Sequence, residues 1–412
     1  MQSTLKDGYI AEHGPNSLML NDARIVQLFD DLDLTDRMIS ADRSSAKRFI
    51  IKNGRPMAMP TSVKNILFNK VLTPPALLRI ACEPFIAKSP DLDDQSFADF
   101  VRHRLGKTVL NYAAGAFVNG IYAGDPEKLN FRLAFPRMHK LVSEKRSLIL
   151  AATKKPAADP NRLRKKEIIS FKNGMQELPE AFETKLKSLG TTLLKQVSNS
   201  KVSANTDQSW EYSYTHDGME HQEDFDQIIV TVPAHRLHTI QFPDSIDLAY
   251  TKNIEHPPVA SLLLGYKRSD VKHPLDGFGM LASLPEKTDI LGALFTSTLF
   301  PEYHRAPSDH VAINVMLGGS RNPEVVAYSE SQMIETAHRE ITKNLDITSE
   351  PSFHHLVKWE NAIPQVNLGH EKVLTELATI EEANPGLTFA GNYRGGIAVG
   401  DCLINGMELS VD

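Results

Sequence analysis

The chain has 412 residues, of which 41% are hydrophobic, and a formal net charge of −6. This length predicts two or three domains, because single hydrophobic cores stop growing near ~250–300 residues, and the acidic balance argues against a general nucleic-acid-binding protein. With only two cysteines, Cys82 and Cys402, the chain cannot form a disulfide framework or a four-cysteine zinc site, and a reducing compartment is favoured.

The first 60 residues are predicted to alternate strands and one helix. Gly8–Glu12 is predicted to be a strand, followed by a turn fixed by Gly14 and Pro15. Apolar residues at helical spacing predict a helix over 22–34. The dipeptide Asn53-Gly54 predicts a hairpin turn between two short strands.

Residues 61–155 have a mostly helical pattern interrupted by prolines, which favours a helical subdomain. The stretch 154–167 is rich in proline and basic residues and is expected to be a surface linker. A strand and an Asn-Gly turn then precede a helix that is predicted to begin at Glu177 and to stop at Gly190.

The second half of the chain is predicted to be rich in strands. Residues 191–197 (TTLLKQV) and 228–232 are expected to be strands, the latter ended by a proline. Short apolar runs over 258–320 predict a mostly antiparallel sheet. A helix is predicted over 329–345, and a strand with a following loop over 354–365.

The last segment combines a strand, a glycine loop and a helix. Leu387–Ala390 is predicted to be a buried strand, and Val399–Ser410 a helix with Asp401 able to cap it. The glycines between them allow tight turns and a close approach of backbone to a ligand. Such a unit points backbone N–H groups and a positive helix end at whatever lies above it. By itself, an ordinary glycine-rich loop is the better interpretation.

Taken in chain order, these segments resemble protoporphyrinogen oxidases, within the wider amine-oxidase-like flavoprotein class. The resemblance covers essentially the whole chain. The segments that carry it are DGYIAEHGPNS, KRFIIKNGRPMAMP, NGIYAGDPEKLNFRLAFPRMHKL, SFKNGMQELPEAF, DQIIVTVPA, LDGFGMLAS, VMLGGS, WENAIPQVNLGH and LTFAGNYRGGIAVGDCLINGM.

The resemblance implies a fold that combines α/β and α+β parts. These would be an incomplete Rossmann-like FAD domain (1–42, 194–255 and 385–412), a helical subdomain (46–163) and a mixed-sheet substrate domain (164–193 and 256–384). It implies FAD- and O₂-dependent oxidation of protoporphyrinogen IX or coproporphyrinogen III in heme biosynthesis, with release of hydrogen peroxide. This chemistry needs no nucleophile and no metal, so no catalytic side chain and no metal ligand is expected.

The resemblance also implies site residues. The residues that would contact the flavin are Gly14, Pro15, Asn16, Ser17, Trp359, Ile397, Ala398 and Val399, and the residue near the adenine would be Val197 or, in an alternative alignment, Asn199. Those that would bind the substrate are Arg48, for a propionate, and the apolar wall Phe278, Gly279, Leu281 and Met316. Taken alone, Trp359 could equally be a core residue, and the substrate-wall residues would be assigned to a core.

Other residues with suggestive positions are given structural roles. His354-His355 and the pair His235 and His238 have loosely metal-like spacing, but no third ligand is placed. Cys402 lies at a helix start that could lower a thiol pKa, and it is interpreted as a packing residue.

The sequence contains no GxGxxG, the turn on which this family holds the FAD diphosphate. We therefore expect a truncated or mis-started chain that binds FAD poorly if it is complete. Two alternatives remain open: another flavin oxidase, of amine or carotenoid type, and a non-catalytic porphyrin-binding protein.

The sequence has neither a signal-peptide pattern nor a long apolar run, so we expect a cytoplasmic protein. Residues 64–87 have an apolar face that could dock on a membrane surface or form a core helix pair. A homodimer is compatible with the resemblance.

Overall fold

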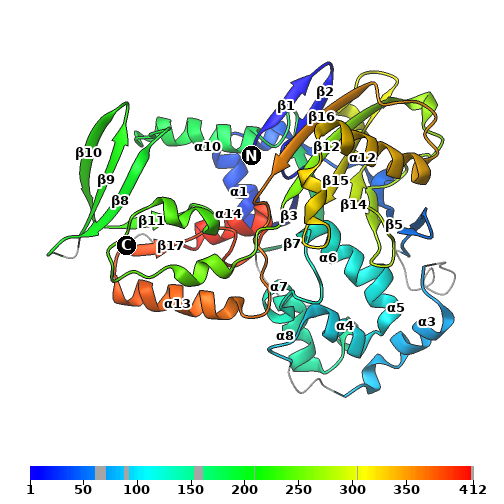
Figure 1. Ribbon diagram of the computed structural model, residues 1–412, viewed down its shortest axis with the longest axis horizontal. Helices are drawn as coiled ribbons and strands as arrows, with labels where there is room; N and C mark the ends of the chain where they lie inside the picture. Colours follow the sequence, from blue (N-terminus) through cyan, green and yellow to red (C-terminus); the bar gives the residue numbers. More distant parts are fainter. Residues whose placement is uncertain (61–70, 88–91, 153–160, 208, 304, 410–412) are drawn as a thin grey trace.

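The computed structural model of the chain describes every residue except 61–70, 88–91, 153–160, 208, 304 and 410–412. A large sheet and its helices occupy one side of the molecule, a group of helices lies below it, and smaller sheets with long helices occupy the other side (Figure 1). The fold is therefore a mixed α/β structure with a mixed sheet, as expected. Among the described residues, no helix has the length and apolar character needed to cross a membrane.

The large sheet has seven strands and is antiparallel except for the pairing of β13 with β5. In spatial order the strands are β16 (Phe353–Trp359), β12 (Val259–Lys267), β15 (His310–Gly318), β14 (Ile290–Leu294), β13 (Gly279–Ala282), β5 (Arg48–Lys52) and β6 (Arg55–Ala58). The turn between β5 and β6 uses Asn53 and Gly54, both with positive φ, which confirms the hairpin.

One face of this sheet packs against α12 (Glu330–Leu345), which begins with a capping box at Ser329. The opposite face is called the α6 face, and its residues include Arg48, Leu281 and Met316. They share a face because side chains alternate along strands and paired residues point the same way. Leu281 pairs with Gly292, which pairs with Met316.

Two elements cover parts of the α6 face. Helix α6 (Gly115–Tyr122) lies over β13 and β14, so closely that a Cβ on Gly120 would meet Leu281 Cδ2 at 2.3 Å. At the other end of the face lies the hairpin of β1 (Ser3–Lys6) and β2 (Tyr9–Glu12), where the rings of Tyr9 and Phe353 stack.

A three-stranded sheet, in the order β3–β7–β4, lies beside the large sheet. Its strands are β3 (Leu18–Asp22), β7 (Arg162–Phe171) and β4 (Met38–Ser40). Because β7 begins at Arg162, the prediction of a surface linker over 154–167 is wrong at its end; pairing with β3 extends the strand into the basic stretch. The rest of that stretch, 153–160, lies outside the described residues.

One face of the β3–β7–β4 sheet packs against three helices. They are α1 (Ala23–Asp31), which Asp22 caps as the sequence indicated, α10 (Glu177–Ser188) and α14 (Val399–Met407). The other face is called the Ile39 face and consists of Met19, Ile39, Lys166, Ile168 and Ser170.

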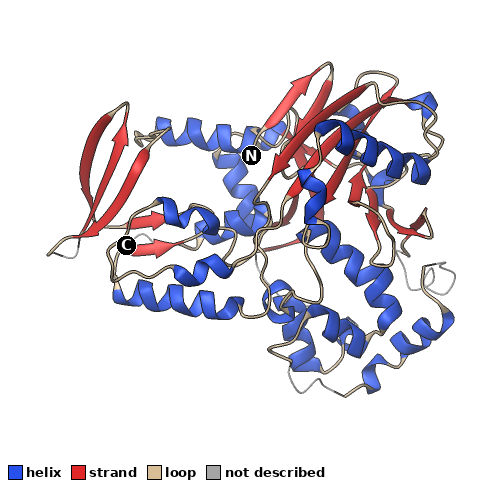
Figure 2. Cartoon of the chain, viewed as in Figure 1, coloured by secondary structure: helices blue, strands red, loops and turns tan. Residues whose placement is uncertain are grey.

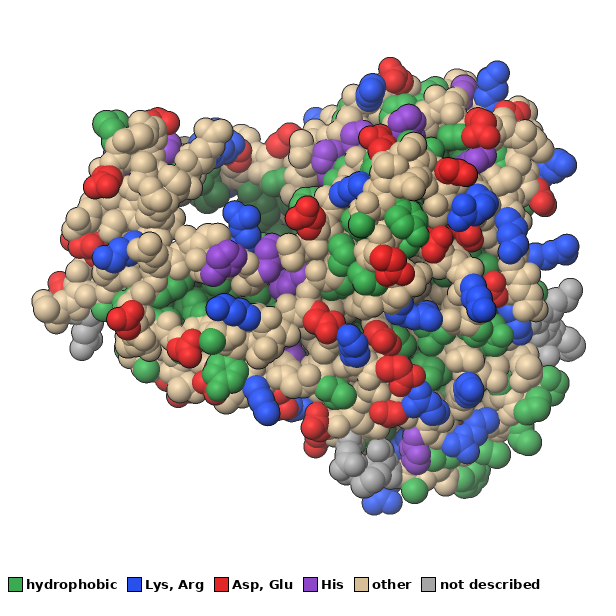
Figure 3. Space-filling model, in the orientation of Figure 1, with side chains coloured by type: hydrophobic (Ala, Val, Ile, Leu, Met, Phe, Trp, Pro, Cys, Tyr) green, Lys and Arg blue, Asp and Glu red, His purple; other side chains and the backbone are tan. Residues whose placement is uncertain are grey.

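The remaining strands form two small sheets. β11 (Ile228–Val230) pairs in parallel with β17 (Leu387–Phe389), beside α13 (His370–Ala383). The other sheet has β8 (Ser198–Ala204), β9 (Trp210–His216) and β10 (Met219–Phe225), and it extends away from the body (Figure 2). An opening separates it from the body in the space-filling view (Figure 3).

The predicted strand over 191–197 is wrong, because that segment forms no strand and is mostly exposed. Apolar residues in this segment favour a strand, but a strand also needs a partner. In the sheets that the structure describes, no strand pairs with this segment. The strand β10 was not predicted.

The helical region follows the prediction for 61–155 as far as the structure describes it. Its helices are α3 (Pro74–Ala81), α4 (Phe97–Arg104), α5 (Lys107–Val109), a π-helical turn (Leu110–Ala114), α6, α7 (Phe131–Ala134), α8 (Pro136–Lys145) and α9 (Leu148–Ala152). Four short helices contain a single turn or little more. The region buries a hydrophobic cluster that includes Phe100, Val118 and Phe131.

Candidate functional site

The turn Gly14–Ser17 follows β2, whose last residue is fixed by a buried ion pair. The Glu12 carboxylate accepts hydrogen bonds from Arg305 Nη1 at 3.2 Å and from the Met175 N–H at 3.0 Å. Arg305 also donates to the Phe171 carbonyl oxygen at 2.9 Å. The network joins β2 to β7 and therefore holds the start of the turn in place.

Trp359, at the end of β16, contacts this turn directly. Its indole Nε1 donates a hydrogen bond to the His13 carbonyl oxygen at 2.6 Å. The indole is 46% exposed, so it does not belong to the core. The His13 Nε2 lies 3.4 Å from the His355 Nε2, a second contact between β16 and the start of the turn.

The loop between β17 and α14 has backbone conformations that require glycine at three positions. Gly391, Gly395 and Gly396 have φ values of 146°, 82° and 136°, which side chains rarely allow. A Cβ on Gly396 would meet the Asp401 carboxylate at 2.5 Å. Desolvation raises the pKa of the Asp401 carboxyl, and the Ala398 N–H lowers it by a smaller amount.

The first turn of α14 presents backbone N–H groups that a helix cannot satisfy internally. The first intrahelical bond runs from the Cys402 N–H to the Ala398 carbonyl oxygen. The N–H groups of Val399 and Gly400 precede that bond, at the positive end of the helix. Ile397 and Ala398 lead into this turn, as the sequence predicted.

The start of α14 lies beside the strand that follows the turn. A Cβ on Gly400 would lie 3.6 Å from the Met19 carbonyl oxygen, and Val399 packs in the same cluster as Leu18. Segments almost 400 residues apart in the chain therefore meet, with Ser17 directly before Leu18 and Ala398 directly before Val399. Val197 lies elsewhere, half-buried just before β8.

The residues expected to bind substrate lie around β5 and β13. The Arg48 guanidinium carbon stands 4.2 Å above the centre of the Phe278 ring, a cation–π contact. Its Nη1 donates to the carbonyl oxygens of Ser45 and Ala46 at 3.1 and 2.9 Å. Gly279 pairs with Arg48, and a Cβ there would strike the neighbouring strand β14.

Phe278 links the two sheets, because it packs against the cluster of Ile39, Leu299 and Phe300. Phe278 therefore connects the α6 face with the Ile39 face, and these two faces together are called the shared surface. Met316 and Leu281 lie on it, in the row described above.

Two exposed charged groups, one of them a predicted site residue and the other in the first turn of α14, have pKa values that the surrounding protein shifts. Desolvation lowers the pKa of Arg48 and raises the pKa of Asp401, although both side chains are exposed. Nearby, burial raises the pKa of Tyr122 to about 12, with a smaller contribution from the Asp401 charge.

The histidine and cysteine interpretations can be compared with the structure. Among the described residues, no group of three or more His, Cys, Asp or Glu side chains is arranged to hold a metal ion. Cys402 is exposed, so its interpretation as a core packing residue is wrong. Desolvation and then Asp401 raise its thiol pKa, which works against a reactive thiolate.

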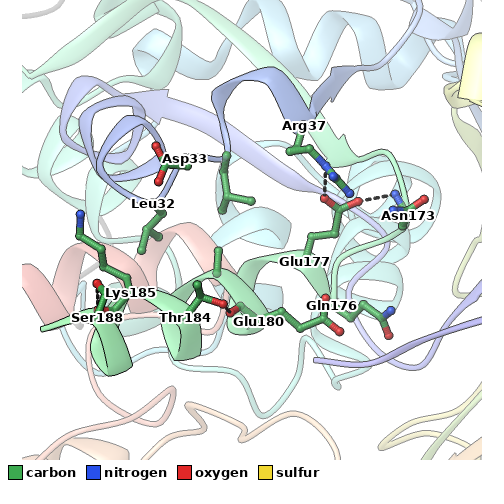
Figure 4. A pocket seen from close by; sticks show the side chains of 12 residues that line it. Leu32, Asp33, Arg37, Asn173, Gln176, Glu177, Glu180, Thr184, Lys185 and Ser188 are labelled. Carbon is green, nitrogen blue, oxygen red and sulfur yellow. Dashed lines mark hydrogen bonds and ion pairs between the residues drawn. The ribbon is translucent and has the colours of Figure 1, made fainter. Parts of the chain in front are cut away.

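A separate hollow of about 460 Å³ lies between the end of α1 and α10 (Figure 4). Arg37 and Glu177 are paired across it at 2.8 Å. It adjoins the helix-covered face of the β3–β7–β4 sheet, and its lining shares no residue with the predicted site.

The residues present fit the ring system of a flavin. Three glycines with positive φ leave their own positions of the loop without side chains, and nothing lies within 4 Å of a Cβ built on Gly14. Helix N–H groups in the first turn of α14 can donate to carbonyl oxygens and hold negative charge. The fit concerns the ring only, since no GxGxxG turn for a diphosphate occurs in the sequence.

Comparison with known proteins extends over nearly the whole chain. Residues 1–410 match the family model described as flavin containing amine oxidoreductase. A mitochondrial protoporphyrinogen oxidase of Nicotiana tabacum is 28% identical over 434 residues, covering 98% of this chain and 86% of the relative. A coproporphyrinogen III oxidase of Bacillus subtilis (strain 168) is 27% identical, covering 98% and 87%.

The fold is also similar to a crystal structure from Exiguobacterium sp. 255-15, provisionally named a protoporphyrinogen oxidase. The TM-score is 0.79 at 18% identity, and the match covers 98% of this chain and 87% of that one. At this level of identity the likeness concerns the fold.

Proposed function

The chain belongs to the family of flavin containing amine oxidoreductases, and on this premise we propose that it oxidises a porphyrinogen to the porphyrin in heme biosynthesis, with FAD as cofactor. The names of the tobacco and Bacillus relatives support the substrate class. The structural observation that carries the proposal is the contact between the start of α14 and the strand that follows the Gly14–Ser17 turn.

FAD, when bound, would supply a two-electron oxidation, with O₂ as acceptor and hydrogen peroxide as product. Three such rounds account for the six electrons and six hydrogens that separate a porphyrinogen from a porphyrin, and they consume three O₂.

The protein's part is to hold the partners and to stabilise charge. The N–H groups of Val399 and Gly400 would stabilise negative charge at the ring edge that they face. The Trp359 indole fixes the end of β16 against the opposite turn. Met316 and Leu281 supply apolar surface for a flat macrocycle.

Arg48 would bind a propionate of the substrate. Its Nη1 is committed to carbonyl oxygens, and its plane lies against Phe278, so the guanidinium is oriented before a ligand arrives. Desolvation lowers the pKa of Arg48 because it disfavours the charged guanidinium. A bound carboxylate would stabilise that charged form.

The test is turnover with flavin content measured in the same preparation. The purified chain should show flavin absorbance bands and convert porphyrinogen to fluorescent porphyrin with O₂ consumption, and Arg48→Met should raise KM. Porphyrin binding without flavin would contradict the proposal in favour of a porphyrin-binding protein. Oxidation of amines but not of porphyrinogens would favour another flavin oxidase.

We also propose peripheral contact with the cytoplasmic face of a membrane through the helical region. Phe85 is 89% exposed and Leu78 on α3 is 66% exposed, which places large apolar side chains on the surface. The chain should float with liposomes, and Phe85→Ser should weaken flotation. Flotation that is the same with and without the substitution would overturn this assignment.

A further inference from the structure

His13 is the last residue before the Gly14–Ser17 turn, and its imidazole ring contacts side chains of two different strands. From β1, the Thr4 Oγ1 lies 2.8 Å from the His13 Nε2. From β16, the His355 Nε2 lies 3.4 Å from the same nitrogen, and the centres of the two imidazole rings are 5.3 Å apart. Neither histidine belongs to the predicted site, although one of them directly precedes the turn that is predicted to contact the flavin.

His355 and Trp359 attach β16 to His13 at two points. They are four residues apart on the strand, so their side chains emerge on the same face. In the pairing with β12, His355 lies opposite Leu263 and Trp359 opposite Val259. Trp359 donates to the His13 carbonyl oxygen at 2.6 Å, while His355 contacts the His13 ring. One strand therefore holds both the backbone and the side chain of the residue from which the turn begins.

The contact between the two ring nitrogens depends on how many protons the pair holds. A neutral imidazole has one N–H donor and one acceptor nitrogen. With both rings neutral, one Nε2 can donate to the other, and one ring can take a further proton while the other still accepts. When both rings are charged, both Nε2 atoms carry hydrogens, and two like charges face each other across 3.4 Å. Full protonation therefore removes the contact between His355 and His13.

The surroundings of the pair mostly disfavour positive charge. Burial lowers the pKa of both His13 and His355, because it disfavours the charged rings. The charge of His355 and that of the amino terminus lower the pKa of His13 further. For His355, Lys6 of β1 and His354 also lower the pKa, whereas Glu330 at the start of α12 raises it. Both rings are therefore neutral above about pH 6.5, the ordinary pKa of histidine.

We propose that His13 and His355 position the Gly14–Ser17 turn for the flavin only while at least one of the two rings is neutral, so that affinity for FAD falls in acid. The inference rests on the proposed function, because it takes the turn to contact the flavin. When both rings are charged they separate, and the movement of His13 weakens the Trp359 bond to its carbonyl oxygen. A lowered pKa means that the released state binds more protons. The attachment is therefore complete above the ordinary histidine pKa and is lost as the pH falls through the lowered values.

His354 provides a matched comparison on the same strand. It directly precedes His355, so its side chain emerges on the opposite face of β16. Its Nε2 lies 3.6 Å from the Glu330 carboxylate, and the residue is exposed. The two neighbouring histidines thus have the same chemistry, but of these two it is His355 that contacts His13.

The first test measures the FAD dissociation constant of the full chain between about pH 8 and 5 by quenching of flavin fluorescence. In the wild type the constant should rise about five- to tenfold as the pH falls, as on loss of one hydrogen bond. His355→Leu should bind FAD weakly at every pH. His355→Gln, whose amide can contact His13 but takes up no proton, should recover most of the affinity and lose most of the pH dependence. His354→Gln should keep the pH dependence of the wild type.

A second measurement follows the start of the turn without flavin. The chain has two tryptophans, so isotopic labelling of the indole nitrogens should give two Nε1–H signals in an NMR spectrum. The Trp359 signal should move as the pH falls in the wild type and in His354→Gln, but not in His355→Gln. The Trp210 indole, which donates to the Pro385 carbonyl oxygen at 2.9 Å, should keep its signal and so show that the chain remains folded.

Two kinds of result would overturn the inference. One is a pH dependence of FAD affinity that is absent, or that is equal in the wild type and in His355→Gln. The other is a Trp359 signal that does not move in acid. A wild type that binds no FAD even at the alkaline end of the range would instead contradict the proposed function. The Trp359 signal would then still decide whether the histidine pair holds the turn.

Discussion

The Trp359 indole nitrogen donates to the His13 carbonyl oxygen over 2.6 Å, so the last residue of β16 and the first residue after β2 are held together. The bond is made by a side chain that is largely open to solvent. We therefore infer that Trp359 holds the start of the Gly14–Ser17 turn in place and is not a core residue.

Trp359→Phe should weaken FAD binding several-fold, because it keeps an aromatic ring but removes the only N–H donor of the indole. Titration of the protein with FAD, followed by flavin fluorescence quenching, measures this. The control is Trp210→Phe, which removes an indole bond to the Pro385 carbonyl oxygen at 2.9 Å, in a different cluster. It should lower stability by about 1 kcal/mol and leave FAD affinity unchanged. Equal affinities for wild type and Trp359→Phe would contradict this role.

Gly396→Ala should abolish or strongly reduce FAD binding. A Cβ at φ 136° would be strained and would meet the Asp401 carboxylate in the first turn of α14 at 2.5 Å. The matched control is Gly406→Ala in α14, the helix that follows the loop, where nothing lies within 4 Å of the new Cβ. This control should stabilise the chain by about 0.5–1 kcal/mol. Flavin content after purification is the readout, and normal content in Gly396→Ala would refute the argument.

Arg305→Met should destabilise the chain by about 3–5 kcal/mol, because it leaves the Glu12 carboxylate buried without its cation. Denaturation by urea measures the free energy of unfolding. The double variant Glu12→Gln with Arg305→Met should recover part of that loss, since the unpaired charge is gone. Strict additivity of the two single effects would show that the pair is not coupled.

Stability should fall as the pH is lowered below about 6.5. Burial lowers the pKa of His370, whose Nε2–H donates to the Tyr393 carbonyl oxygen at 2.8 Å. A depressed pKa means that the unfolded chain binds more protons, so the stabilisation is complete above the unfolded pKa and is lost as the pH falls through the folded pKa. Unfolding midpoints between pH 7.5 and 5 in urea, for example, would record this. In His370→Gln the slope should be shallower, and an unchanged slope would assign the acid sensitivity to other histidines.

Local chemistry made several elements of the fold predictable. Asn53 and Gly54 both adopt positive φ, which these residues tolerate and most others do not. The hairpin could therefore be predicted from these two residues alone. Asp22 caps α1 through the next residues in the chain. The glycine loop before α14 was predicted for the same reason, because its conformation excludes most side chains.

Elements that depend on a distant partner were not predictable in the same way. Residues 191–197 have a strand-like composition, yet nothing in the described sheets pairs with them. The stretch that begins at Arg162 has the composition of a linker but becomes a strand because β3 lies beside it.

The resemblance supplied the site residues, and the structure brings most of them together without testing their roles. Trp359 contacts the residue before the Gly14–Ser17 turn, and the start of α14 contacts the strand after it. Arg48 stacks on Phe278, which packs against Ile39. Nothing in the residues Val197 or Asn199 alone could decide between the two alignments. Their position before and within β8 reflects pairing with β9.

The contact of Gly400 with the strand that contains Met19 has a consequence for how the protein is made. During synthesis the early strands emerge long before their partner helix exists, so the first segments must wait for most of the chain to be translated. Closing so long a loop is entropically costly and slow compared with forming the β5–β6 hairpin. A peptide-bond break between β16 and α14 should therefore leave the large sheet intact but release α14. A folding chain should acquire cofactor affinity only in its last step.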